Sequence, residues 1–268
     1  MSGSLPVAVQ TAGWDSLRRF TDARIALGRA GHSQPTAAHL AFQLAHAQAR
    51  DAVHLPLDLA AMADRLRTLG LAVLPAHSAA TDRATYLQRP DLGRQLDDVS
   101  ARRLADRAGD PVDLAVVIAD GLSALGVMQN AVPLLTHLLP LLRADPVHAW
   151  TMAPVVLVAQ GRVAIGDPVG DSLRARTVVV LIGERPGLSS PDSLGIYFTW
   201  SPRVGMSDAQ RNCISNVRDA GLSPERAAVK LHHLLSRARA LQLSGVNLKD
   251  DVDDSLPAKN KPTQLVKP

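Results

Sequence analysis

Aromatic residues and cysteine are scarce in this sequence. The chain of 268 residues holds three Trp, two Tyr and three Phe, so the base-stacking surfaces of single-strand-binding proteins are not expected. One cysteine excludes an internal disulfide and fits a reducing compartment. The N-terminus lacks the pattern of a signal peptide, and the apolar runs are interrupted short of the length that spans a bilayer. These absences predict a cytoplasmic protein that contacts neither nucleic acid nor membrane.

Several common site motifs are also absent. The string G-x-x-x-x-G-K-[ST] does not occur, which excludes a P-loop nucleotidase. Gly161, Gly166 and Gly170 lack the G-x-G-x-x-G spacing, so a nucleotide-dependent oxidoreductase is disfavoured. His39 and His46 have no nearby Cys pair and no H-E-x-x-H string, so we predict no metal site.

The charged residues are dominated by arginine. The sequence has 24 Arg and five Lys, with a formal net charge of +4. The arginines are scattered between acidic residues, a pattern typical of solvated helix faces. A guanidinium also suits bidentate contacts to carboxylates, amides or phosphates, so some of these arginines are candidates for ligand binding.

Short apolar runs alternate with helix-length segments in the second half of the chain. We expect strands over 113–119, 154–159, 177–182 and 194–200, and helices over 123–142 and 224–241. Such alternation is typical of a parallel sheet with helices on both faces. The sequence therefore predicts an α/β fold with a doubly wound, mostly parallel Rossmann-like sheet.

The first half of the chain has a helical pattern. We expect helices over 37–51, 57–69 and 100–108, the first after a start signal at 33–36 and the second ended by Gly70. The predicted organisation has four parts: a flexible arm over 1–13, a helical lobe with a connecting segment over 14–112, an α/β domain over 113–249 and a flexible tail over 250–268.

Three polar, glycine-containing loops follow the predicted strands. They cover residues 120–123, 160–163 and 183–187. Ligands of open α/β sheets bind outside the carboxyl ends of the strands, so these loops predict a binding site. The alternative is that Gly and Pro build turns there and nothing more. For Cys213 the common alternative is a buried apolar group, and no neighbouring histidine supports a catalytic thiol.

The chain resembles the small subunit of ethanolamine ammonia-lyase from about residue 21 to residue 249. Six strings in the family's order carry the resemblance: residues 22–31 (DARIALGRAG), 35–36 (PT), 119–123 (ADGLS), 161–167 (GRVAIGD), 181–188 (LIGERPGL) and 211–216 (RNCISN). The resemblance implies a hetero-oligomer with a large TIM-barrel subunit that converts ethanolamine to acetaldehyde and ammonia by a radical mechanism. It also implies that adenosylcobalamin binds at the interface between the two subunits and that this chain alone is inactive.

The resemblance implies three cofactor-binding residues: Val163, Glu184 and Cys213. We expect apolar or backbone contact from Val163, recognition of corrin amides by Glu184 and close packing by Cys213, with Arg162 and Arg185 as neighbours. No D-x-H-x-x-G string is present to supply a lower histidine ligand, so the cofactor is expected base-on. No residue of this chain is expected to be catalytic, since the radical chemistry belongs to the cofactor.

Two questions stay open at the level of sequence. A noncatalytic Rossmann-like ligand-binding or regulatory module is the alternative function. The family's link to bacterial microcompartments implies packaging through the N-terminus, but residues 1–13 form no clear amphipathic helix. The N-terminal helices could either dock on the large subunit or form a self-contained cap.

Overall fold

The centre of the molecule is a six-stranded sheet. The computed structural model describes residues 9–249, so the predicted tail and most of the predicted arm lie outside the described residues. The strands follow the order β1-β3-β2-β4-β5-β6 across the sheet. Their bounds are Val73–His77 for β1, Val112–Ala119 for β2, Val155–Ala159 for β3, Ala175–Gly183 for β4, Leu194–Trp200 for β5 and Arg211–Val217 for β6.

Five of the six strands run in the same direction. β1 pairs with β3, β3 with β2 and β2 with β4 in parallel, whereas β5 is antiparallel to both β4 and β6. The carboxyl ends of β1 to β4 and of β6 therefore lie at one edge, together with the start of β5. We call this the carboxyl edge and the opposite one the amino edge.

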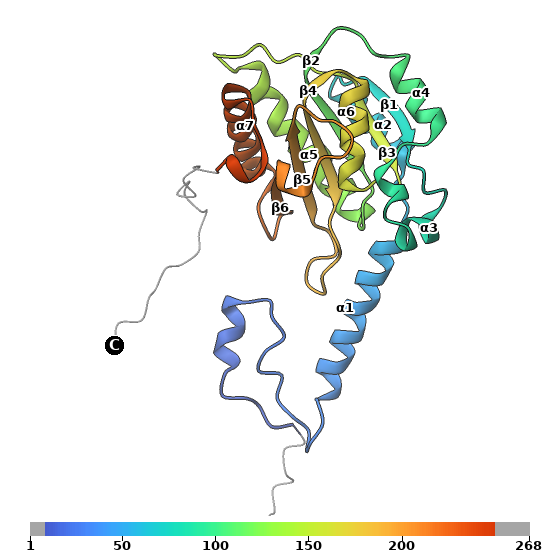
Figure 1. The fold of residues 1–268 in the computed structure, drawn as a ribbon. Coiled ribbons are helices and arrows are strands. Elements are labelled where there is room, and N and C mark those ends of the chain that lie inside the picture. Colours follow the sequence, from blue (N-terminus) through green and yellow to red (C-terminus); the bar gives the residue numbers. More distant parts are fainter. Residues whose placement is uncertain (1–8, 250–268) are drawn as a thin grey trace, which may run out of the picture.

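Helices cover both faces of the sheet (Figure 1). On one face, α2 (Leu59–Thr68), α5 (Ala124–Arg143) and α7 (Pro224–Leu241) pack over alternate residues of the strands. On the other, α4 (Asp98–Ala105) and α6 (Gly166–Ser172) pack over the intervening residues. The remaining described elements are α1 (Thr36–His54), α3 (Arg83–Gln88) and the 3₁₀ helices η1 (Asp15–Phe20), η2 (Leu92–Arg94), η3 (Val163–Ile165), η4 (Asp208–Gln210) and η5 (Gly245–Asn247).

The strands have the composition that their burial requires. All of β2 except its first residue is buried, and β4 is buried except for Arg176. Parallel strands that are covered on both faces need continuous apolar runs rather than alternation. By contrast, only Arg211, Ile214 and Val217 are buried along β6, and Cys213, Ser215 and Asn216 are exposed.

The predicted mixed α/β class is confirmed, but the Rossmann-like winding is not. The classic dinucleotide-binding order is 3-2-1-4-5-6, which places the third strand of the chain at the edge. Here the edge strand β1 comes first in the chain, and β5 runs against its neighbours. The sheet is mostly parallel without having the classic order.

The segment before residue 112 contributes to the same core as the later one. β1 is a strand of the common sheet, although that region was expected to be helical or turn-rich. Met62 and Leu66 of α2 are buried in the core that also holds α5 and α7. The predicted domain boundary at 112 stays a prediction, and the sheet spans both sides of it.

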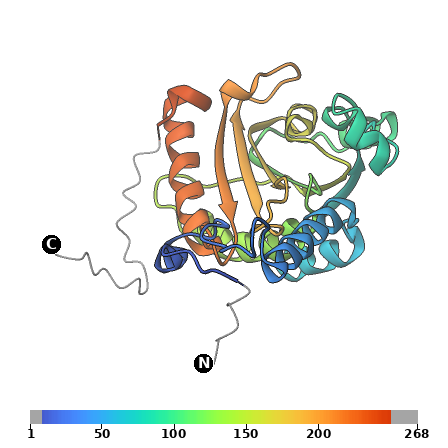
Figure 2. The same cartoon turned by 90° about the horizontal axis from the view of Figure 1, so that it is seen from below.

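The first part of the described chain stands apart from this core. Figures 1 and 2 show α1 projecting from the α/β body, with residues before it lying beyond the carboxyl edge. Only Ala45 and Ala52 are buried along α1. Trp14 and Phe20 are 68% and 73% exposed, so this segment has no apolar core of its own.

Helix α5 is long and apolar enough to cross a membrane by length and composition alone. This corrects the expectation that no apolar segment of the chain approaches such a length. Ten of its residues are buried, among them Val127, Leu134 and Leu138, which lie in the main core. The apolar composition of α5 therefore reflects its packing against the sheet and against α7.

The helix boundaries follow local capping signals. Ser123 begins α5 by accepting a hydrogen bond from the backbone N–H of Gly126 at 3.1 Å, and Ser223 begins α7 in the same way. Gly70 follows the end of α2 with a φ of +78°, the left-handed conformation that favours glycine, as predicted.

Candidate functional site

The three predicted loops meet at the carboxyl edge around a pocket of about 290 Å³. They follow β2, β3 and β4, whose ends are adjacent in the sheet. The prediction that these loops come together is confirmed. The lining residues are Tyr86, Gly121, Leu122, Arg162, Val163, Ile182, Gly183, Glu184, Arg185 and Tyr197.

Asp120 joins the first two loops. Its carboxylate accepts hydrogen bonds from the backbone N–H groups of Gly121, Gln160 and Gly161, each at 3.0 Å. Arg83 lies 3.7 Å from the same carboxylate. Burial of Asp120 raises its pKa, while these donors and Arg83 favour the charged form. Asp120 holds the loops after β2 and β3 together and has little capacity left for a ligand.

Glycine is required where the first and third loops touch. Gly121 has a φ of +58°, and a Cβ there would overlap the backbone oxygen of Gly183. A Cβ on Gly183 would in turn overlap the backbone of Ser123 and Asp120. The backbone N–H of Leu122 donates to the carbonyl of Gly183 at 2.9 Å. The close approach of the loops after β2 and β4 therefore depends on these two glycines.

Glu184 lies in the pocket directly after β4. Its Oε2 accepts a hydrogen bond from the backbone N–H of Asn216 at 3.1 Å, at the end of β6. Its own N–H donates to the carbonyl of Ser193, just before β5. Glu184 thus links the ends of three strands, and within residues 9–249 its Oε1 accepts no hydrogen bond. That oxygen is available to accept a hydrogen bond from a ligand.

Val163 also lines this pocket, at the start of η3. The structure therefore brings Val163 and Glu184 into one pocket. Arg162 precedes Val163 and is partly buried, whereas Arg185 follows Glu184 and is exposed. Both arginines that were expected as neighbours line the pocket.

Tyr86 is a pocket residue that the sequence reasoning missed. It is fully buried, and its ring lies between two guanidinium groups, 4.6 Å from Cζ of Arg83 and 4.1 Å from Cζ of Arg162. Burial raises the pKa of Tyr86 to about 12. Within the described chain, its hydroxyl and Nε of Arg162 have no hydrogen-bond partner. Buried donors without partners are rare, and here they lie at a pocket where a ligand could pair with them.

Cys213 lies outside this lining. It is opposite Tyr197 in the antiparallel pair of β5 and β6, and Tyr197 itself lines the pocket. Cys213 is exposed, so the interpretation of this residue as a buried apolar group is wrong. The pKa of its thiol is raised, first because neighbouring protein atoms partly desolvate it. The structure therefore places Cys213 beside the pocket, next to the lining residue Tyr197.

The rarity of tyrosine in the sequence was the signal that could have identified Tyr86 and Tyr197 as site residues. The chain has only two Tyr, at 86 and 197, and both line the same pocket. Neither belongs to the glycine-containing loops that drew attention in the sequence. Tyr86 is on α3 and Tyr197 is in the middle of β5, so only the tertiary structure brings them to the loops.

Comparisons with known proteins identify the family. The family model for the ethanolamine ammonia-lyase light chain (EutC) matches residues 11–249. The ethanolamine ammonia-lyase small subunit of Azotobacter vinelandii is 61% identical over 243 residues, which cover 90% of this chain and 89% of that protein. The corresponding small subunits are 58% identical in Pseudomonas paraeruginosa, with 93% and 91% covered, and 59% identical in Ralstonia nicotianae, with 91% of each covered.

The described pocket lies wholly within the matched region. Both the extent of the family match and the identity over most of the chain's length are far above what a shared fold alone produces. The chain therefore belongs to the ethanolamine ammonia-lyase small-subunit family, as the sequence resemblance indicated.

Proposed function

We propose that this member of the ethanolamine ammonia-lyase small-subunit family binds part of adenosylcobalamin at an interface with a large catalytic subunit. The complex would convert ethanolamine to acetaldehyde and ammonia. When bound, the cofactor would supply radical chemistry by homolysis of its cobalt–carbon bond. The observation that carries the proposal is the pocket at the carboxyl edge, in a chain whose family membership implies a large-subunit partner.

The size of the pocket supports a shared site. A volume of about 290 Å³ lies at the lower limit for small-molecule sites, and a corrin with its axial groups is much larger. This chain could therefore cover only one side of the cofactor. A second protein surface is needed to enclose the remainder and to exclude water from the reacting atoms.

The chemistry of the lining fits the amide-rich rim of a corrin. Carbonyl groups of such amides could pair with the buried donors that have no partner, the Tyr86 hydroxyl and Nε of Arg162. Amide N–H groups could donate to Oε1 of Glu184, because its Oε2 is already held by Asn216. Val163 would contribute an apolar contact beside them.

Cys213 would act differently from Val163 and Glu184. Its exposed position on the uncovered face of β6 makes it available for packing against a cofactor that extends beyond the pocket. The raised pKa favours a neutral thiol, which suits close packing rather than nucleophilic attack. The base-on state of the cofactor stays part of the proposal. Nitrogen hyperfine coupling from histidine in the EPR spectrum of the cob(II)alamin form would contradict it.

The N-terminal segment is proposed to dock on the large subunit. Leu40, Phe42 and Leu44 are 57%, 39% and 60% exposed on α1, and Trp14 and Phe20 precede them. With two buried residues along α1, this segment does not have the core of a self-contained cap. Exposed apolar side chains of this number are typical of protein interfaces.

The proposal is tested by turnover. This chain and its co-expressed large subunit should release acetaldehyde and ammonia from ethanolamine only when both chains and adenosylcobalamin are present, and each chain alone should be inactive. A well-folded complex that binds the cofactor without turnover would instead favour the ligand-binding or regulatory module. The cytoplasmic location and packaging in a microcompartment stay predictions.

A further inference from the structure

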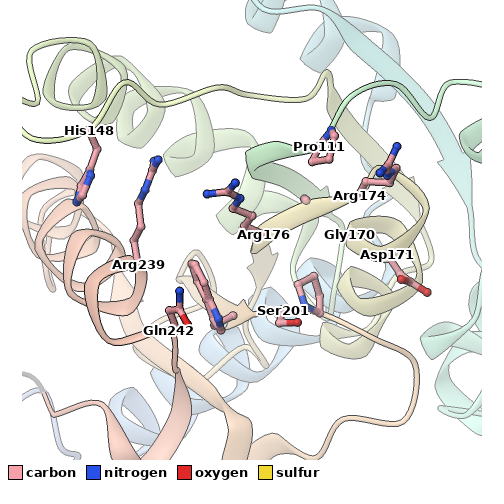
Figure 3. A pocket seen from close by; sticks show the side chains of 12 residues that line it. Pro111, His148, Gly170, Asp171, Arg174, Arg176, Ser201, Arg239 and Gln242 are labelled. Carbon is pink, nitrogen blue, oxygen red and sulfur yellow. The ribbon is translucent and has the colours of Figure 1, made fainter.

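A second cavity lies at the amino edge, opposite the pocket of Tyr86 and Glu184. Its volume is about 790 Å³. It is lined by the segment before β2, the end of α6, the start of β4, the end of β5 and the end of α7 (Figure 3). The lining residues that matter for its chemistry are Arg174, Arg176, Arg239, Asp171, Trp200 and Gln242.

Three arginines from different elements contribute to this cavity. Arg176 is at the start of β4, Arg239 is near the end of α7 and Arg174 is in the turn between α6 and β4. Figure 3 shows Arg176 and Arg239 on neighbouring sides of the cavity, with His148 beyond Arg239. Asp113 is the carboxylate that two of them share, at 3.7 Å from Arg176 and 3.2 Å from Arg239.

These guanidiniums are incompletely paired. Asp113 is already engaged, because its Oδ2 accepts from the backbone N–H and the hydroxyl of Thr151. Nη1 of Arg239 is buried and makes no hydrogen bond of good geometry within the described residues. Arg174 donates to the carbonyl of Gly109 at 3.2 Å, with no carboxylate partner among residues 9–249. The cavity therefore has more N–H donors than the surrounding protein uses.

Arg211 shows how this fold satisfies an arginine that is purely structural. Its two terminal nitrogens donate to the two oxygens of Asp167 at 2.6 and 2.7 Å, and both side chains are almost fully buried. Further bonds to Thr199 and to the carbonyl of Met206 complete the set. The pairs around Asp113 are longer and fewer, so stabilisation of the fold does not account for three arginines at the amino edge.

The backbone at Arg174 supports the same conclusion. Arg174 follows the end of α6 with a φ of +53°, a position where glycine is normally favoured. An arginine is disfavoured in this conformation, because its Cβ crowds the neighbouring backbone. Gly170, one turn earlier, lies against Pro202, so the segment is packed tightly enough to hold this geometry.

We propose that this cavity binds a phosphate-bearing small molecule. The fork of a guanidinium matches the oxygens of a phosphate group, and three arginines line this cavity, where Asp171 and the shared Asp113 are the acidic groups described beside them. The volume exceeds that of a phosphate ion and falls in the range of small-molecule sites. Trp200 and Gln242 provide apolar and hydrogen-bonding surface for the remainder of the molecule. The site is at the opposite edge from the proposed cofactor site and does not depend on it.

Isothermal titration calorimetry on the complex of this chain with its large subunit tests the proposal. Inorganic pyrophosphate is the probe, and acetate is the comparison that has a carboxylate in place of the phosphate. We expect one pyrophosphate per small subunit, bound more tightly than acetate. Arg176→Gln and Arg174→Gln should each weaken pyrophosphate about tenfold or more, since each removes a charge-assisted hydrogen bond.

Arg67→Gln is the matched control. It removes the same charge from an exposed pair on α2, away from the cavity, and should leave the affinity for pyrophosphate unchanged. Thermal unfolding checks that Arg176→Gln folds, which its 58% exposed side chain favours. The proposal is overturned if the complex does not bind pyrophosphate. The large subunit covering the cavity would explain that result. Equal affinity for pyrophosphate in the wild-type and folded Arg176→Gln complexes would overturn it as well.

Discussion

The two edges of the sheet both have arginine-lined pockets, but these pockets are built differently. At the carboxyl edge, Asp120 is saturated by three backbone N–H groups, and glycines let the loops approach closely. At the amino edge, Asp113 serves two arginines at 3.2 Å and 3.7 Å, and a third arginine has a carbonyl partner only. The carboxyl edge is thus organised by the backbone, and the amino edge by long side chains from separate elements.

This difference bears on how each pocket responds to mutation. A site built on backbone contacts loses its shape when a supporting group is removed, so stability and binding should fall together. A site built on charged side chains can lose binding while the fold remains intact. The following predictions begin with the largest expected effect.

Asp120→Ala should be the most damaging change at the carboxyl edge. It leaves the buried N–H groups of Gly121, Gln160 and Gly161 without an acceptor, which is expected to lower the free energy of unfolding by about 3–5 kcal/mol. Urea denaturation measures this loss. Asp91→Ala, which removes an exposed carboxylate paired with an arginine, should change stability by about 1 kcal/mol or less. Similar losses in the two variants would contradict the bridging role of Asp120.

Asp145→Asn tests a saturated carboxylate between α5 and β3. Asp145 accepts hydrogen bonds from the indole of Trp150 and from the backbone of Val147 and His148. At pH 7 the variant should be less stable by about 1–3 kcal/mol. Asp64→Asn, at a 75% exposed site, is the control and should have almost no effect.

The effect of Asp145→Asn should depend on pH in a defined direction. The pKa of Asp145 is lowered below its usual value: desolvation opposes this shift, and the hydrogen bonds from Trp150 and the backbone outweigh it. A folded-state pKa below the unfolded-state value stabilises the fold above about pH 4, and this stabilisation is lost as the pH falls further. Thermal unfolding midpoints of the wild type and the variant should therefore converge at low pH. A constant difference across pH would show that the charge of Asp145 is not the cause.

Glu184→Gln should separate binding from stability at the carboxyl edge. The amide keeps the shape of the side chain and an acceptor for the N–H of Asn216, so the fold should change little. We expect the affinity of the complex for adenosylcobalamin to fall about tenfold, the effect of one charge-assisted hydrogen bond. Equilibrium dialysis measures this affinity. Unchanged affinity would eliminate an ionic role for Glu184.

Tyr86→Phe should have the smallest effect on the free energy of unfolding. Whether the variant is more or less stable helps to distinguish a binding role of the hydroxyl from a structural one. The hydroxyl of Tyr86 is buried without a partner, so its removal should leave the free chain equally stable or more stable by about 1 kcal/mol. If the cofactor pairs with this hydroxyl, the same variant should bind adenosylcobalamin several-fold more weakly. A less stable free chain with unchanged cofactor affinity would assign Tyr86 a structural role instead.

Most helices and the central strands were predictable from local pattern. The expected strands at 113–119, 154–159, 177–182 and 194–200 correspond to β2, β3, β4 and β5, within two residues at each end. The expected helices at 123–142 and 224–241 correspond to α5 and α7 within one residue. These segments are buried on extended faces, so burial imposes a clear apolar pattern on them.

The edge strands were not predictable in the same way. β1 lies in the segment that was expected to be helical or a connecting segment, and it contains Pro75, which lacks the N–H that a central strand needs. β6 has Ile214 and Val217 as its buried apolar residues, and Cys213, Ser215 and Asn216 are exposed. A strand with one buried face near an edge has too few apolar residues to differ clearly from a loop.

The candidate site was predictable in part. The strand-end rule identified the loops of Val163 and Glu184, since the carboxyl ends of adjacent parallel strands must lie together. The family resemblance pointed to Cys213, which lies beside that pocket, and its role in binding stays a prediction. Tyr86 and its two arginines could not be found, because no local pattern predicts which helix packs near the end of β3.

The sequence by itself determined where most strands and helices begin and end, which loops are polar and glycine-rich, and to which family the chain belongs. These properties depend on neighbouring residues or on matching strings. The tertiary structure alone decided the strand order, the contact of Tyr86 with Arg83 and Arg162 and the presence of three arginines around one cavity at the amino edge. Those features depend on packing between residues far apart in the chain. The local periodicity of the sequence does not predict such packing.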